Sequence, residues 1–186
     1  MNSLSADESA VLLHRDGILA YPTEAVWGLG CDPFNAAAVM RLLALKQRAV
    51  EKGLILIAGD IGQFDGLLDW QALPHDRSRS VLDSWPGPNT WIVPATVRVP
   101  RWIKGAHEGV AVRVSAHRAV VALCAAFGGP LVSTSANDAG KPPAKTLVDL
   151  DPQLIAHLDG VMEGHTGGLA QPTLIRDALT GAVLRN

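Results

Sequence analysis

Hydrophobic residues along this chain fall into short continuous runs, separated by longer stretches in which they recur at helical spacing. Residues 18–21 (ILAY) and 54–57 (LILI) are apolar throughout, which is typical of strands buried on both faces of a central sheet. Between these runs, Val39, Leu42 and Leu43 repeat at the three- and four-residue spacing of one helix face, after Asn35 as a possible cap. The pattern therefore predicts a helix over residues 35–47 that connects two buried strands.

The rest of the chain continues this alternation. A first helix is expected to begin after Ser5 and to end at Gly17. Further strands are predicted at residues 90–97, 110–114, 130–134, 161–162, 173–176 and 182–184, and further helices at residues 61–68, 77–84, 117–127 and 149–158. Such an order indicates α/β layers, and the short connections between some strands favour a mixed parallel and antiparallel sheet. Without a repeat or a linker, residues 1–186 are interpreted as one domain.

Composition narrows the class of protein. With 48% hydrophobic and 18% charged residues, the chain is too apolar for disorder. It contains no apolar run of the roughly 18–20 residues that a membrane span needs, and its start lacks the basic region of a secretory signal. Cys31 and Cys124 lie far apart and are interpreted as reduced core residues. These features predict a cytoplasmic protein without membrane contact.

Several common kinds of site are absent from the sequence. It has no GxxxxGK[ST] phosphate loop, no GxGxxG fingerprint and no GxSxG elbow. The six histidines show no metal-ligand spacing, so no metal site on the protein itself is predicted. A net charge of −2 and a pI near 6.3 do not indicate a nucleic-acid binder, although a local basic cleft remains compatible with them.

Polar residues interrupt the apolar pattern at the ends of predicted strands, where α/β sheets bind ligands. Residues 21–32 (YPTEAVWGLGCD) run from a strand end through Thr23 into a glycine-bearing turn, and taken alone they also fit a plain tight turn. Lys46, Arg48 and Lys52 fall within seven residues and can grip a polyphosphate. A helix end also favours exposed cations through its dipole, so that alternative stays open.

Two later strands carry further candidates. Arg113 stands inside the apolar run VAVRV, where it must pair or face a cavity because an unpaired buried charge is costly. A substrate carboxylate and a structural salt bridge are both open interpretations. Residues 130–137 (PLVSTSAN) change from an apolar strand into Ser133, Ser135 and Asn137, whose hydroxyls and amide can line an anion site. A turn cluster is the alternative.

Six motifs thus follow one another: YPTEAVWGLGCD, the KxR of residues 46–48, KGLILIA, WPGPNT, VAVRV and PLVSTSAN. In this order they resemble the YrdC-like threonylcarbamoyl-AMP synthase family, in its short TsaC type, over residues 17–185. The resemblance implies a single-domain YrdC-like α/β fold: a twisted mixed sheet, flanking helices and a concave cleft. It also implies a nucleotidyltransferase that forms L-threonylcarbamoyladenylate and pyrophosphate from L-threonine, bicarbonate and ATP. The product would pass to the tRNA threonylcarbamoyl transferase complex, which modifies tRNA next to the anticodon.

The resemblance also assigns roles by position. The nucleotide-binding tetrad, which would carry catalysis, corresponds to Lys46, Arg48, Ser135 and Asn137. Further ATP contacts correspond to Lys52 and Arg185, and threonine contacts to Thr23, Arg113 and Ser133. Mg²⁺ is expected on the phosphates of ATP with few protein ligands of its own. The threonine amine is expected to capture CO₂ as a carbamate whose oxygen attacks the α-phosphorus, a step that needs positioning more than a nucleophile.

Three positions depart from the family pattern. Ala49 stands where many relatives have proline, Ile57 where longer relatives often have histidine, and Pro172 with Thr173 where a Ser-Thr pair is common. These differences bear on the shape of the threonine pocket rather than on the tetrad. The alternative function is a double-stranded RNA or ribosomal RNA-binding ribosome maturation factor that uses the same basic cleft, and contact with tRNA is compatible with either function.

Overall fold

A computed structural model of the chain describes residues 3–137, 140–171 and 173–185. The strands of this part are β1 (Leu19–Pro22), β2 (Trp27–Gly30), β3 (Ile55–Ala58), β4 (Asn89–Pro94), β5 (Gly109–Val114), β6 (Leu131–Ser135), β7 (Gly160–Val161), β8 (Leu174–Asp177) and β9 (Val183–Arg185). They join one sheet in the order β7-β1-β2-β6-β3-β5-β4-β8-β9. The pairs β7–β1, β3–β5 and β4–β8 are parallel and the other pairs are antiparallel, which confirms the predicted mixed sheet.

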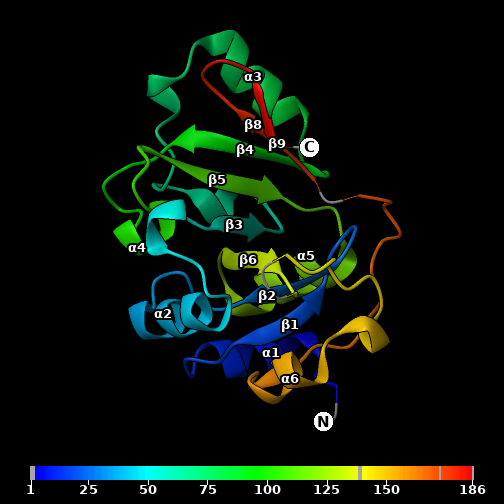
Figure 1. Ribbon diagram of the computed structural model, residues 1–186. Helices are drawn as coiled ribbons and strands as arrows, with labels where there is room; N and C mark the ends of the chain where they lie inside the picture. Colours follow the sequence, from blue (N-terminus) through cyan, green and yellow to red (C-terminus); the bar gives the residue numbers. More distant parts are fainter. Residues whose placement is uncertain (1–2, 138–139, 172, 186) are drawn as a thin grey trace.

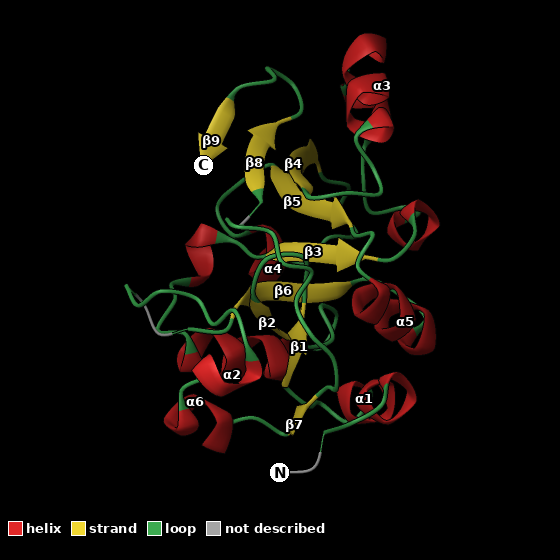
Figure 2. Ribbon diagram, turned by 90° about the vertical axis from the view of Figure 1, so that its right-hand side faces the viewer, coloured by secondary structure: helices red, strands yellow, loops and turns green. Residues whose placement is uncertain are grey.

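Helices cover both faces of this sheet. They are α1 (Ala6–Leu13), α2 (Ala36–Leu45), α3 (His75–Asp83), α4 (Arg101–Lys104), α5 (Arg118–Phe127) and α6 (Pro152–Ala156), with 3₁₀ turns at Val50–Lys52, Ile61–Phe64, Trp70–Ala72 and Leu147–Asp149. Figure 2 shows α2 and α6 on one side of the lower strands and α1 and α5 on the other. In Figure 1, β3 and β6 lie between an upper group of strands with α3 and a lower group with α1, α2 and α6. None of the helices in the described ranges is both long and apolar enough to cross a bilayer.

The core consists of two clusters that the sheet separates. Along β1 the side chains alternate, so that Ala20 packs into the larger cluster with α2 whereas Leu19 and Tyr21 pack into the smaller one with α5. Both clusters are dominated by side chains with almost no exposure. Residues 18–21 are therefore buried on both faces, as predicted, whereas in residues 54–57 Ile55 is only partly buried because it lines a cavity. This burial fixes the register of the central strands.

Most predicted elements are confirmed, and side-chain caps explain where α1 and α2 begin. Ser5 forms a capping box with Glu8 at the start of α1, and the Asn35 side chain accepts from the Ala38 amide at the start of α2. The first helix ends at Leu13, several residues before the predicted Gly17, because the chain turns through Asp16 with φ of 65°.

Two helix predictions and one turn prediction are wrong in detail. Residues 61–68 form only a short 3₁₀ turn, because Gly62 and Gly66 interrupt the helical pattern and Gly66 has φ of 75°. Residues 149–158 divide into the 3₁₀ turn Leu147–Asp149 and α6, which starts after Asp151 with Pro152 at its first position. Residues 21–32 are a β-hairpin rather than a strand ending in a turn, since β2 pairs with β1 from Pro22↔Trp27 to Leu19↔Gly30. The sequence pattern also missed α4.

Candidate active site

The β1–β2 hairpin forms one wall of the candidate site. Its turn is closed by Thr23, whose amide and hydroxyl both donate to the Val26 carbonyl, at 3.1 and 2.7 Å. On its other side β2 pairs with β6, with Gly28 opposite Ser135. The strands approach closely at Gly30, where a Cβ atom would lie 2.6 Å from the Val132 carbonyl oxygen. Glycine is therefore required for this wall to form.

A cavity of about 460 Å³ opens beside this hairpin. Eight of the nine site residues predicted from the sequence line it: Thr23, Lys46, Arg48, Lys52, Arg113, Ser133, Ser135 and Asn137. The remaining lining residues are Ala25, Val26, Gly28, Gln47, Leu54, Ile55, Thr134, Pro143 and Thr173. Arg185 is the last residue of β9, and its side chain lies outside the described part of the structure, so its nucleotide contact stays a prediction.

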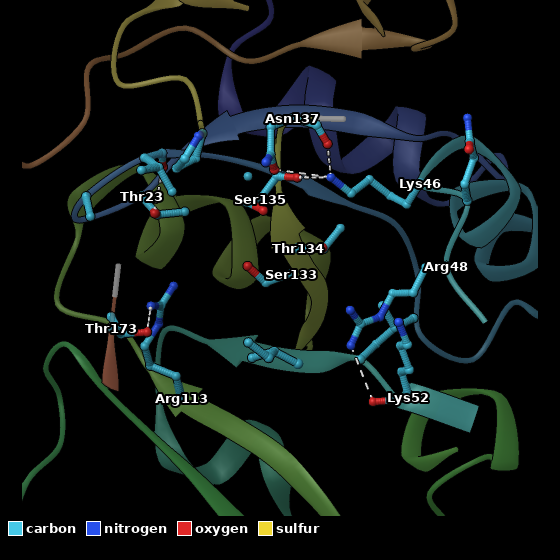
Figure 3. Close-up of a pocket in the computed structure, with 17 residues that line it drawn as sticks. Thr23, Lys46, Arg48, Lys52, Arg113, Ser133, Thr134, Ser135, Asn137 and Thr173 are labelled. Carbon is cyan, nitrogen blue, oxygen red and sulfur yellow. Dashed lines mark hydrogen bonds between the residues drawn. The ribbon is translucent and has the colours of Figure 1, made fainter. Parts of the chain in front are cut away.

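Figure 3 shows that the polar side chains gather at two ends of the cavity. Lys46, Arg48 and Lys52 lie at one end, and Thr23, Arg113 and Thr173 lie at the other. Ser133 projects into the space between them. The cavity can therefore hold a molecule with a polyanionic part at one end and a carboxylate at the other.

The cationic end is built by the C-terminus of α2. Lys46 is the C-cap of α2, and its ammonium group donates to the Ser135 carbonyl at 2.7 Å and to the carbonyl and side-chain oxygens of Asn137. This ties the end of β6 to the end of α2. Gln47 then adopts φ of 47°, a left-handed conformation that is strained for a residue other than glycine. The turn brings Arg48 onto the cavity wall, where its guanidinium donates to the Gly53 carbonyl at 2.8 and 3.0 Å.

The opposite end is organised around Arg113, which is only 7% exposed. Its Nη1 donates to the Thr173 hydroxyl at 2.9 Å, and that hydroxyl lies 3.0 Å from the Thr90 hydroxyl. Its Nη2 lies 3.5 Å from the Glu24 carboxylate. Arg113 is therefore ion-paired and also lines the cavity, and its contact with a substrate carboxylate stays a prediction.

Two residues at this end were not selected from the sequence. Thr173 was noted only as a departure from the family pattern, and Glu24 only as part of the first motif. Glu24 is 7% exposed and accepts a hydrogen bond of 2.7 Å from Ser115, which is fully buried. A signal for Glu24 existed, since a buried Arg113 requires an acidic partner and Glu24 is one of the two acidic residues of the first motif, with Asp32 as the other.

The three departures from the family pattern have small structural effects where they can be examined. Ile57 is fully buried in the cluster with α5 and does not line the cavity, whereas Ile55, two residues earlier on β3, does. Ala49 has φ of −63°, the value that proline would impose, so the backbone is the same as with proline. Pro172 lies outside the described residues.

The two cysteines behave as the sequence predicts. Both are fully buried and unpaired, and burial raises the pKa of each thiol to about 12. Burial also raises the pKa of Tyr21, whose hydroxyl donates to the Val132 carbonyl at 3.2 Å behind the cavity wall. In the described ranges, no group of three or more His, Cys, Asp or Glu side chains could hold a metal ion.

Comparisons with known proteins place this geometry in context. A model of the Sua5, YciO and YrdC family, described as telomere recombination, matches residues 11–186. The threonylcarbamoyl-AMP synthase of Stenotrophomonas maltophilia (strain K279a) is 59% identical over 186 residues, which is the full length of both chains. Among solved structures, Sua5 of P. abyssi in complex with L-threonine is 27% identical with a TM-score of 0.85, and a variant of that protein is 26% identical with a TM-score of 0.87. The matches cover 92% and 96% of this chain but only 50% and 54% of the Sua5 chains.

Proposed function

Because the chain belongs to the Sua5/YciO/YrdC family, we propose that it is a threonylcarbamoyl-AMP synthase, a nucleotidyltransferase. It joins L-threonine, bicarbonate and ATP into L-threonylcarbamoyladenylate and releases pyrophosphate. One observation carries this proposal beyond the names of its relatives. A single cavity has three cations at one end, a buried arginine with available donors at the other, and hydroxyls between them.

The cationic end suits the triphosphate of ATP. Lys46 acts as a point charge, while Arg48 presents a planar fork that matches phosphate oxygens. Lys52 lies beside them on the same wall. We assign Ser135 and Asn137 to the same nucleotide, because the hydrogen bonds from Lys46 hold their backbone at this end. These contacts would neutralise the charge that develops on the phosphates during transfer.

The other end suits the zwitterion of threonine. The Arg113 guanidinium would bind the carboxylate, and Thr173 holds that guanidinium in place through its hydroxyl. Ser133 and Thr23 supply the nearby hydroxyl groups. P. abyssi Sua5, which shares this fold, has been crystallised with L-threonine. The position of Arg113 and the hydroxyl groups in this chain supports the assignment of this end of the cavity to the amino acid.

The reaction then follows from position. Bicarbonate takes up a proton and loses water to give CO₂, which the neutral threonine amine attacks. The amine nitrogen then releases a proton, so that the carbamate carries one negative charge on oxygen. A carbamate oxygen attacks the α-phosphorus of ATP, and the bond from that phosphorus to the β-bridging oxygen breaks. Pyrophosphate leaves with the electron pair. Holding the two substrates at the two ends of one cavity makes this step effectively unimolecular, which is the main source of acceleration in such a site.

Mg²⁺ and the biological partners belong to the same proposal. Mg²⁺ would arrive bound to the phosphate oxygens of ATP, as a hard cation that keeps much of its water shell. Within the described residues, the cavity lining offers hydroxyl groups and no acidic residue, which fits a Mg²⁺ ion held mainly by ATP and water rather than by the protein. The adenylate would be passed to the tRNA threonylcarbamoyl transferase complex, which implies a cytoplasmic location.

The test is pyrophosphate release by the purified protein. ATP and Mg²⁺ are supplied with threonine and bicarbonate, separately and together. Release that requires both co-substrates, together with an adenylate of the expected mass, is the expected result. If folded protein releases no pyrophosphate under any combination, the proposal is wrong, and the RNA-binding alternative becomes the next to measure.

A further inference from the structure

The buried carboxylate of Glu24 has no assigned part in the reaction, although it lies beside the proposed threonine-binding arginine. Glu24 and Arg113 form the one ion pair of the described residues in which both side chains are less than a tenth exposed, at 9% and 8%. Glu24 is not among the residues that line the cavity, whereas Arg113 is. The carboxylate therefore lies outside the cavity wall, beside the arginine.

Separate contacts hold the two partners of this pair. One Glu24 oxygen accepts from Ser115 at 2.7 Å, and the Glu24 carbonyl accepts from the Leu169 amide at 3.0 Å. Arg113 is held by its strand and by Thr173. The ion pair itself is long at 3.5 Å, and within the described residues neither the second Glu24 oxygen nor the Arg113 Nε has a hydrogen-bond partner.

This arrangement balances the charge of Arg113, while the long ion pair leaves guanidinium N–H groups that can still donate to a substrate carboxylate. A buried guanidinium without a counter-ion would be costly, so Glu24 stabilises the site when it holds no amino acid. When threonine binds, its carboxylate becomes a second anion on the same guanidinium. Two carboxylates near one cation repel each other, and the low dielectric of a buried site strengthens that repulsion.

We propose that Glu24 is a positioning residue that competes electrostatically with the substrate carboxylate for Arg113. It helps to hold the arginine in place, and it weakens the interaction of that arginine with threonine. The product retains the threonine carboxylate, so the same competition loosens the adenylate, which must leave for the next enzyme. This inference rests on the proposed function, because it takes the amino-acid end of the cavity as given.

The experiment measures L-threonine binding by calorimetry, without ATP, for the unaltered protein and for Glu24→Gln. Glutamine keeps the shape and can still accept from Ser115, but it removes the charge. We expect Glu24→Gln to bind threonine about three- to tenfold more tightly, a range that corresponds to a partly screened Coulomb interaction. Its melting temperature without ligand should be lower, and the rise on adding threonine should be larger. A merely structural role would lower the melting temperature without changing threonine affinity.

Matched variants sharpen the test. Glu24→Asp keeps the charge and should bind threonine within about twofold of the unaltered protein, since the Coulomb interaction is retained. Glu108→Gln makes the same chemical change at a fully exposed side chain and should have no effect. L-threoninamide lacks the carboxylate, so Glu24→Gln should not strengthen its binding.

Ser115→Ala should change threonine affinity in the opposite direction to Glu24→Gln, and it tests the inference even if Glu24→Gln does not fold. Without the Ser115 hydroxyl, Glu24 can close on Arg113, and threonine binding should weaken severalfold. Unchanged or weaker threonine binding by folded Glu24→Gln, or tighter binding by Ser115→Ala, would overturn the inference. Pyrophosphate release by the unaltered protein is measured in parallel. If the unaltered protein releases pyrophosphate but the variants bind threonine as it does, only this inference is wrong. If the unaltered protein neither releases pyrophosphate nor binds threonine, the proposed function is wrong.

Discussion

At the scale of single residues, Lys46 connects the fold to the chemistry more directly than any other side chain of the cavity. Its ammonium group joins the end of α2 to the end of β6 and also lies at the proposed phosphate end. Lys46→Ala should lower turnover in the pyrophosphate assay by about 10²-fold or more, the usual loss when one preorganised charge is removed from a transition state.

The fold should survive this change, because Lys46 is a helix cap at the cavity rim rather than a core residue. Circular dichroism and the unfolding midpoint check that point. Lys145→Ala is a suitable control, since Lys145 is exposed and lies outside the cavity lining. Near-normal turnover in folded Lys46→Ala protein would remove this lysine from the proposed site.

The two cysteines give a second residue-scale prediction, with a defined dependence on pH. Because burial raises each thiol pKa from 9.0 to about 12, almost no thiolate exists in the folded protein at pH 8. Ellman's reagent should therefore react with neither thiol of native protein at pH 8, and with both after unfolding. The folded state keeps protons that the unfolded state loses, so this stabilisation is complete below the ordinary thiol pKa and is lost as the pH rises toward 12. Rapid reaction of native protein would show that a thiol is accessible.

At the scale of elements, β2 depends on two glycines for different reasons. A Cβ on Gly30 would meet the Val132 carbonyl oxygen at 2.6 Å and the Tyr21 ring at 2.7 Å, so Gly30→Ala must displace β6 or the ring. It should cost about 1–3 kcal/mol of unfolding free energy, as overpacking usually does. A Cβ on Gly28 would meet its nearest atoms at 3.4–3.6 Å, which is ordinary contact, but Gly28 lines the cavity. Gly28→Ala should therefore leave stability nearly unchanged and lower turnover.

Urea unfolding and the pyrophosphate assay separate these two effects. Gly129→Ala serves as the control, because a Cβ there would contact only the Phe127 ring, at 3.9 Å. Equal stability losses for Gly28→Ala and Gly30→Ala would contradict the difference between the two positions, in which Gly30 is tightly packed and Gly28 has room for a methyl group.

The same strand shows what the sequence could and could not predict. Strands such as β1 and β3 are continuous apolar runs, which was enough to identify them. β2 reads WGLG, and two of its four residues are glycines, which have low strand propensity; its pairing with β1 and β6 is what makes it a strand. The cavity residues could be predicted where polar groups interrupt an apolar run. Thr173 could not, because its position beside Arg113 depends on the pairing of β8 with β4, which is not local in sequence.

At the scale of the whole molecule, charge is distributed unevenly. The net charge is −2, yet four cations line one cavity: Lys46, Arg48, Lys52 and Arg113. One of these four, Arg113, is ion-paired with buried Glu24. Positive charge is therefore concentrated in this cavity, as a site for one small polyanion requires.

This distribution predicts a shallow salt dependence. ATP presents few phosphates to the cavity, so the KM for ATP should change by less than about tenfold between about 50 and 200 mM salt, whereas binding through 6–10 phosphates loses about 10³–10⁵ over that range. Titration of a structured RNA over the same salt series provides the comparison. A weak RNA affinity at 200 mM, together with a nearly constant KM, fits a two-substrate pocket. The opposite result would be tight RNA binding at 200 mM salt that is lost in Lys46→Ala and Arg48→Ala. It would mean that the cations of the cavity bind a nucleic acid, because these substitutions change only the lining of the cavity.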